Sequence, residues 1–129
     1  MASPAVDFGT EEFGALLDSS LNRLNHYMVN SGPLIGYTST GHGAWEATVT
    51  NLFDIDAPVL LCDSGHFSHR WGEMCEAHGL DVHWFETGWQ RGVDPDALRE
   101  VLSTEPGKKI QGVLVAHTET STGVTSDLT

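Results

Sequence analysis

Hydrophobic residues follow two alternating patterns along this chain, one with helical spacing and one in short continuous runs. Residues 10–28 show the first pattern, in a stripe made of Phe13, Leu16, Leu17, Leu21, Leu24 and Met28. Thr10 is suited to cap such a helix, and the two glutamates after it suit the positive end of the helix dipole. The Asn-Ser-Gly-Pro sequence at 30–33 should end it. The pattern therefore predicts a helix over 10–28.

Beyond residue 32, short apolar runs alternate with amphipathic segments. The runs predict strands at 33–37, 59–63, 81–87 and 110–117. The intervening segments predict helices that begin near 42, near 67 and at 95. Trp45, Val49, Leu52 and Phe53 recur on one face of the first of these helices. Ala97, Leu98, Val101 and Leu102 recur on one face of the last.

Alternation of strands with helices of about ten residues indicates an α/β fold with a mostly parallel sheet that helices cover on both faces. The length of 129 residues suits one domain. Ligands of open sheets of this class bind at the carboxyl ends of the strands. The polar loops Thr38–Gly43, Asp63–Phe67 and Thr118–Gly123 are predicted to meet there. These loops form the candidate site.

Composition excludes several classes of function. The net charge of −12, from eighteen acidic against six basic residues, leaves no basic stripe for nucleic acid. No run is apolar enough for a membrane helix, and residues 1–13 do not resemble a secretory signal. Cys62 and Cys75 lie on apolar faces, as free buried thiols do in a reducing compartment. We expect a cytoplasmic protein.

The glycine-rich loop at 36–43 invites comparison with known phosphate-binding motifs. A P-loop would need lysine and Ser or Thr where His42 and Gly43 stand. A dinucleotide fingerprint beginning at Gly41 would need a third glycine where Glu46 stands. What remains is a cradle for a single phosphate at a helix N-terminus, or a plain turn whose glycines serve only its geometry.

Three segments in this order and spacing, STGHGAWEA, DSGHFSHRW and HTETSTGV, resemble class V aminotransferases of the pyridoxal-phosphate fold type I superfamily. The similarity is greatest to the serine–glyoxylate and alanine–glyoxylate aminotransferase group, and it runs from about Phe13 to the end of the chain. VDFGTEEF departs from the family, since it lacks an expected arginine and proline. The resemblance implies that residues 1–129 are the N-terminal part of the cofactor-binding large domain.

Carried over to this sequence, the resemblance implies a pyridoxal 5′-phosphate site made of Thr40, Gly41, His42, Phe67 and Thr120. The first three would form the phosphate cup, chiefly through backbone N–H groups. Phe67 would stack on the pyridine ring and Thr120 would hydrogen-bond on the side of its phenolic oxygen, with Gly123 as the turn that closes the loop. Without the resemblance, the sequence favours Phe67 as a core residue of its helix and Thr120 as a solvated loop residue. No metal site is predicted, because His66, His69, Glu73 and His78 match no zinc signature.

Aminotransferase chemistry also needs a Schiff-base lysine, an aspartate on the pyridine nitrogen and an arginine for the substrate carboxylate. In the family these come later in the chain. The only lysines, Lys108 and Lys109, precede the last strand and should lie at the opposite end of the sheet. We therefore expect no catalytic residue here and an inactive chain when alone.

The parent enzyme, by resemblance, would be a homodimer that acts on small amino acids and 2-oxo acids. It would transfer an amino group to glyoxylate. The alternative is a non-catalytic module that binds a phosphate ligand or a partner protein and has lost the chemistry.

Overall fold

The computed structural model describes residues 5–28, 32–36 and 38–128. It divides into two compact units, residues 1–38 and 39–129, which are described separately. The first unit contains helix α1 (Glu11–Tyr27), where the Thr10 hydroxyl accepts a hydrogen bond from the Phe13 N–H at 3.3 Å. The predicted helix and its cap are confirmed. No side chain of α1 is buried, and Leu16 is 54% exposed.

The strand predicted at 33–37 is wrong over the residues that the structure describes. Residues 32–36 adopt no regular structure, and Tyr37 lies outside the described residues. Ile35, the centre of the apolar run, is 79% exposed. A strand is stabilised by a hydrogen-bonded partner, and an apolar run of this length does not create one.

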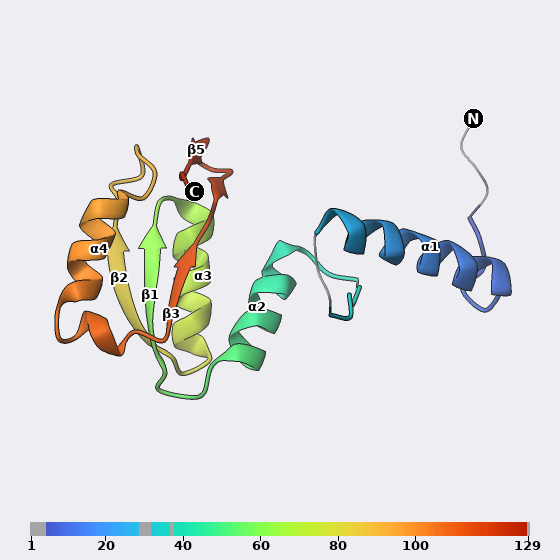
Figure 1. The fold of residues 1–129 in the computed structure, drawn as a ribbon, viewed down its shortest axis with the longest axis horizontal. Helices are drawn as coiled ribbons and strands as arrows, with labels where there is room; N and C mark the ends of the chain where they lie inside the picture. Colours follow the sequence, from blue (N-terminus) through green and yellow to red (C-terminus); the bar gives the residue numbers. More distant parts are fainter. Residues whose placement is uncertain (1–4, 29–31, 37, 129) are drawn as a thin grey trace. The chain divides into compact units, whose positions relative to one another are not determined.

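The second unit is an α/β layer structure built on a parallel sheet with strand order β2-β1-β3 (Figure 1). Its elements in chain order are α2 (Gly41–Leu52), β1 (Pro58–Asp63), α3 (His66–Ala77), β2 (Asp81–Glu86), α4 (Pro95–Ser103), η1 (Gly107–Lys109), β3 (Gly112–Val115), β4 (Thr118–Glu119) and β5 (Val124–Thr125). The predicted alternation of strands and helices and the parallel sheet are confirmed. No helix in the described ranges combines the length and apolar character needed to span a bilayer.

The core lies between the central strand and α3. Val59, Leu61 and Cys62 of β1 are fully buried, as expected of a strand covered on both faces. α2 contributes Val49 to this core, whereas Leu52 of the predicted stripe is 70% exposed. The predicted inner face of α4 is half-buried rather than buried.

The polar segment after β3, predicted as a loop, forms a small antiparallel hairpin. Thr118 of β4 pairs with Thr125 of β5, and Glu119 pairs with Val124. Gly123 has φ +71°, a backbone conformation that glycine adopts without steric cost. The hairpin therefore projects from the carboxyl end of β3 with a fixed turn.

Candidate functional site

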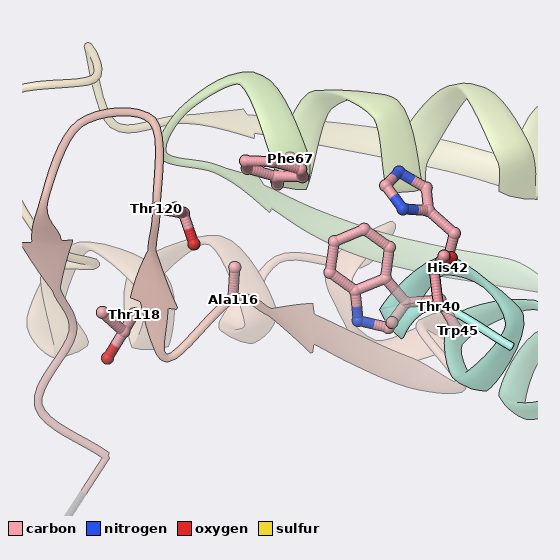
Figure 2. A pocket seen from close by; sticks show the side chains of 8 residues that line it. Thr40, His42, Trp45, Phe67, Ala116, Thr118 and Thr120 are labelled. Atoms are coloured by element: carbon pink, nitrogen blue, oxygen red, sulfur yellow. The ribbon is translucent and has the colours of Figure 1, made fainter.

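A cavity of about 460 Å³ opens at the carboxyl ends of β1 and β3, within the usual size range of small-molecule sites. Its lining residues, shown in Figure 2, are Thr40, Gly41, His42, Trp45, Phe67, Ala116, Thr118 and Thr120. All five residues predicted for the site line this one cavity. The three polar loops therefore meet where the sheet topology predicted, while the binding roles of the residues stay predictions.

The N-terminus of α2 forms one wall of the cavity. Thr40 is the N-cap residue, but its side chain makes no capping hydrogen bond to the helix. A Cβ added to Gly41 would meet no atom within 4 Å, so packing within the protein does not require glycine there. The first N–H groups of a helix carry partial positive charge and favour an anion. This wall therefore presents the positive end of a helix dipole to a ligand, although the Gly43 N–H donates to the Thr40 carbonyl at 3.0 Å.

Aromatic side chains from both α2 and α3 also line the cavity. Phe67, in the first turn of α3, is half-buried and lies 6.0 Å from the His42 ring between ring centroids. Trp45 of α2 contacts His42 edge to face at 4.9 Å. Trp45 also stacks on Trp71 of α3 at 5.0 Å with an interplanar angle of 11°. The His42 ring is inclined by 57° to Phe67 and by 61° to Trp45, so the cavity is lined by aromatic surface rather than by one flat platform.

The N-terminus of α3 contrasts with that of α2, because the hairpin β4–β5 already occupies it. The Ser121 hydroxyl accepts from the His66 N–H at 2.9 Å. The Glu119 carboxylate accepts from the N–H groups of Phe67 (3.3 Å) and Ser68 (2.9 Å). The Ser68 hydroxyl accepts from the Gly65 N–H at 3.0 Å. All four N–H groups that a helix start leaves unpaired thus have protein partners, and α3 has none left for a ligand.

Electrostatically, the cavity depends on backbone dipoles and not on cationic side chains. No lysine or arginine is among its lining residues. Lys109 instead lines a hollow with Pro58 and Asp81, the first residues of β1 and β2, and Lys108 pairs with Glu105 at 2.6 Å. The prediction that both lysines lie at the opposite end of the sheet is confirmed.

Neither cysteine is suited to nucleophilic chemistry. Cys62 and Cys75 are free and fully buried, and burial raises the pKa of each thiol to about 11. On α3, His69 contacts Asp63 at 2.9 Å, and Glu73 pairs with Arg70.

Sequence reasoning missed several residues of the site. The sequence predicts Trp45 only as part of a helix face, Ala116 only as part of a strand, and Thr118 only as part of a polar loop of the candidate site. Glu119 was missed although it is fully buried beside the cavity. The signal for Glu119 was available at Gly65, because a glycine at a helix N-cap has no side chain to accept the N–H groups that follow.

Comparisons with known proteins agree with this geometry. No family model matches the chain. An L-aspartate–glyoxylate aminotransferase of Paracoccus denitrificans is 39% identical over 126 residues, which are 97% of this chain and 32% of the relative. A serine–glyoxylate aminotransferase of Methylorubrum extorquens is 36% identical over 97 residues, 75% of this chain and 24% of the relative. The crystal structure of an alanine–glyoxylate aminotransferase from Nostoc sp. superposes with a TM-score of 0.83 at 29% identity, covering 98% of this chain and 33% of that one.

All three of these relatives are glyoxylate aminotransferases. The chain spans about a third or less of the length of these relatives, and the match fits an N-terminal portion of a class V aminotransferase. The resemblance and the fold class expected from the sequence are both confirmed.

Proposed function

We propose that this chain supplies the phosphate cup and one ring-binding wall of a pyridoxal 5′-phosphate site in a glyoxylate aminotransferase. The single observation that supports this most is the convergence of Thr40–His42, Phe67 and Thr120 on one cavity. These residues come from three segments that resemble the same family. The names of the relatives support glyoxylate as the amino acceptor.

The start of α2 suits the phosphate of this cofactor. Thr40 leaves the first turn without a side-chain cap, and Gly41 leaves bare backbone at the cavity wall. Backbone N–H groups and the helix dipole would therefore hold the phosphate, with the Thr40 hydroxyl as a further donor. Binding would be selective for an anion even though the protein carries a net charge of −12.

The remaining lining residues suit the ring. Phe67 would stack on one face of the pyridine, and the Thr120 hydroxyl would donate to the phenolic oxygen side. When bound, the cofactor would supply the electron sink that amino transfer requires. The lysine, the aspartate and the arginine of the reaction would come from sequence beyond residue 129. The 129-residue chain alone would then be inactive.

The complete enzyme would use a small amino acid as donor and glyoxylate as acceptor. The relatives name different donors, L-aspartate and serine, so the donor is open. By resemblance we further propose a homodimeric, cytoplasmic enzyme. Residues 1–129 would be the N-terminal part of its cofactor-binding large domain.

A binding experiment tests the cup directly. Pyridoxamine 5′-phosphate is the suitable probe because, having no aldehyde, it cannot react with the surface lysines. We expect Gly41→Ala to weaken its binding at least about tenfold, or roughly 1.4 kcal/mol, while the melting temperature stays unchanged. Beyond the adjacent backbone, no protein atom lies within 4 Å of the added methyl group, and Gly41 lines the cavity. Gly14→Ala, which also adds a methyl group in open space on a helix, is the matched control.

Wild-type affinity for pyridoxamine 5′-phosphate no better than for pyridoxamine would disprove the phosphate cup. The enzymatic part of the proposal is tested first by the coding DNA beyond codon 129. A frame that continues to an aspartate-bearing strand and a lysine supports it, and its product should form glycine from glyoxylate with L-aspartate, L-serine or L-alanine. A stop codon there would favour the non-catalytic module.

A further inference from the structure

We propose that Glu119 is a positioning residue that joins the hairpin β4–β5 to the first turn of α3. By doing so it fixes the positions of Phe67 and Thr120 relative to each other in the cavity. Glu119 lines no part of the cavity itself. Its side chain is fully buried, although glutamate is rarely buried without a partner. The ligand-binding test of this role rests on the proposed function. The hydrogen-exchange test does not.

The contacts of Glu119 account for its burial. One carboxylate oxygen accepts from the Phe67 N–H (3.3 Å), the Ser121 N–H (3.0 Å) and the Ser121 hydroxyl (2.7 Å). The other accepts from the Ser68 N–H at 2.9 Å. Burial alone would raise the pKa of Glu119, but these hydrogen bonds outweigh it and hold the pKa below its usual value. The carboxylate is therefore charged at neutral pH and bonded on both oxygens.

Glu119 replaces a cap that α3 cannot provide locally. The N-cap residue of α3 is Gly65, which has no side chain to accept the N–H groups of the first turn. A carboxylate more than fifty residues away in sequence accepts them instead. Gly65 also makes room for it, because a Cβ there would lie 2.4 Å from Glu119 Cγ. Gly65 and Glu119 therefore depend on each other: glycine leaves space for the glutamate side chain, and the glutamate accepts the N–H groups that glycine cannot cap.

The Gly65–Glu119 pair affects the cavity through lining residues next to it, in the hairpin and in α3. Glu119 and Ser121 contact α3, whereas Thr118 and Thr120, which alternate with them, line the cavity. On the helix side, Glu119 holds the backbone of Phe67, whose ring lines the same cavity. One buried carboxylate thus fixes two lining side chains from different segments. Its hydrogen bonds within the described part of the chain go to α3 and to Ser121, and not to α2, which holds the proposed phosphate cup.

The test compares Glu119→Gln with Asp94→Ala in the otherwise unchanged protein. Glutamine keeps the size of the side chain, but its NH₂ group cannot accept from an N–H, so at least the Ser68 N–H, or those of Phe67 and Ser121, loses its partner. Asp94 is the matched control, because its carboxylate caps α4 by accepting from Asp96 and Ala97 and lies outside the cavity lining. Gly65→Ala tests the same pair by placing a methyl group where the Glu119 side chain lies.

The first measurement needs no ligand. In Glu119→Gln and Gly65→Ala, amide hydrogen exchange should become at least about tenfold faster at Phe67, Ser68 and Ser121, while the amides of β1 keep their rates. Asp94→Ala should speed exchange only in the first turn of α4. Unchanged exchange at Phe67 and Ser68 in Glu119→Gln would overturn the proposal, whether or not the protein binds the cofactor.

The second measurement separates positioning from general loosening. Glu119→Gln should weaken pyridoxamine 5′-phosphate binding about tenfold and leave the affinity for inorganic phosphate within about twofold. Asp94→Ala should change neither affinity. Equal weakening of both ligands, or of neither, would overturn the positioning role. If the wild-type protein binds neither ligand, the proposed function fails, and the exchange experiment alone decides the role of Glu119.

Discussion

At the scale of single residues, the sequence predicted the site residues that lie in the three family-like motifs, because the order and spacing of these motifs can be read directly from the chain. Thr40, Phe67 and Thr120 follow from three such motifs, and the structure brings them to one cavity. Glu119 and Gly72 could not be predicted in the same way. Their roles depend on partners distant in sequence, Ser68 for Glu119 and Trp84 for Gly72.

Gly72 gives a prediction that tests the packing of α3 on the sheet. A Cβ at this position would lie 2.2 Å from Trp84 Cη2 and 2.3 Å from Leu61 Cδ2. Gly72→Ala should therefore lower the free energy of unfolding by about 1–3 kcal/mol, although alanine is the better helix former. Chemical denaturation measures the change. Gly14→Ala, with open space around its Cβ, is the control and should cause no loss.

At the scale of elements, local signals were predictive and non-local pairing was not. α1 and α4 begin at the caps predicted for them, Thr10 and Asp94, because a cap acts within three residues. The apolar run at 33–37 failed as a strand because pairing depends on a partner elsewhere in the chain. The hairpin β4–β5 was missed because it gives no apolar pattern: most of its residues are polar, and its strands have only two residues each.

The junction between β1, α3 and the loop after β2 gives a prediction about pH. Asp63 ends β1 and contacts His69 Nδ1 of α3 at 2.9 Å, and it accepts a hydrogen bond from Trp89 Nε1 at 2.9 Å. The hydrogen bond to Asp63 raises the pKa of His69 above its usual value, with burial opposing it and Asp63, Glu73 and Glu76 adding attraction. Because the folded-state pKa is raised, the stabilisation is fully present below about pH 6.5 and is lost as pH rises through the folded-state pKa.

The measurement is the free energy of unfolding of wild type and His69→Gln at about pH 5.5 and about pH 8.5. The wild type should exceed the variant by more at the lower pH. Asp63→Asn is the control, and in it the pKa of His69, followed by NMR, should fall toward the ordinary value. A difference that is the same at both pH values would show that the ion pair does not contribute.

At the scale of the whole molecule, the buried core and the candidate site both belong to residues 39–129. The buried hydrophobic cluster joins α2, β1, α3 and β3, and the cavity lies in the same unit. In the other unit, α1 buries none of its side chains within the described part of the chain. We therefore expect the two units to differ in their resistance to local unfolding.

Limited proteolysis tests this difference. Residues 32–36 adopt no regular structure and Ile35 is 79% exposed, so a protease of broad specificity should cut there first. The segment 104–111 is the internal comparison: it also connects two elements, but Gly107 is buried, and the N–H groups of Lys108, Lys109 and Gln111 donate to backbone carbonyls. Mass spectrometry should therefore show an early fragment that begins between 33 and 40 and remains intact through residue 111. Early cleavage within 104–111 would mean that backbone hydrogen bonding in this connection does not protect it.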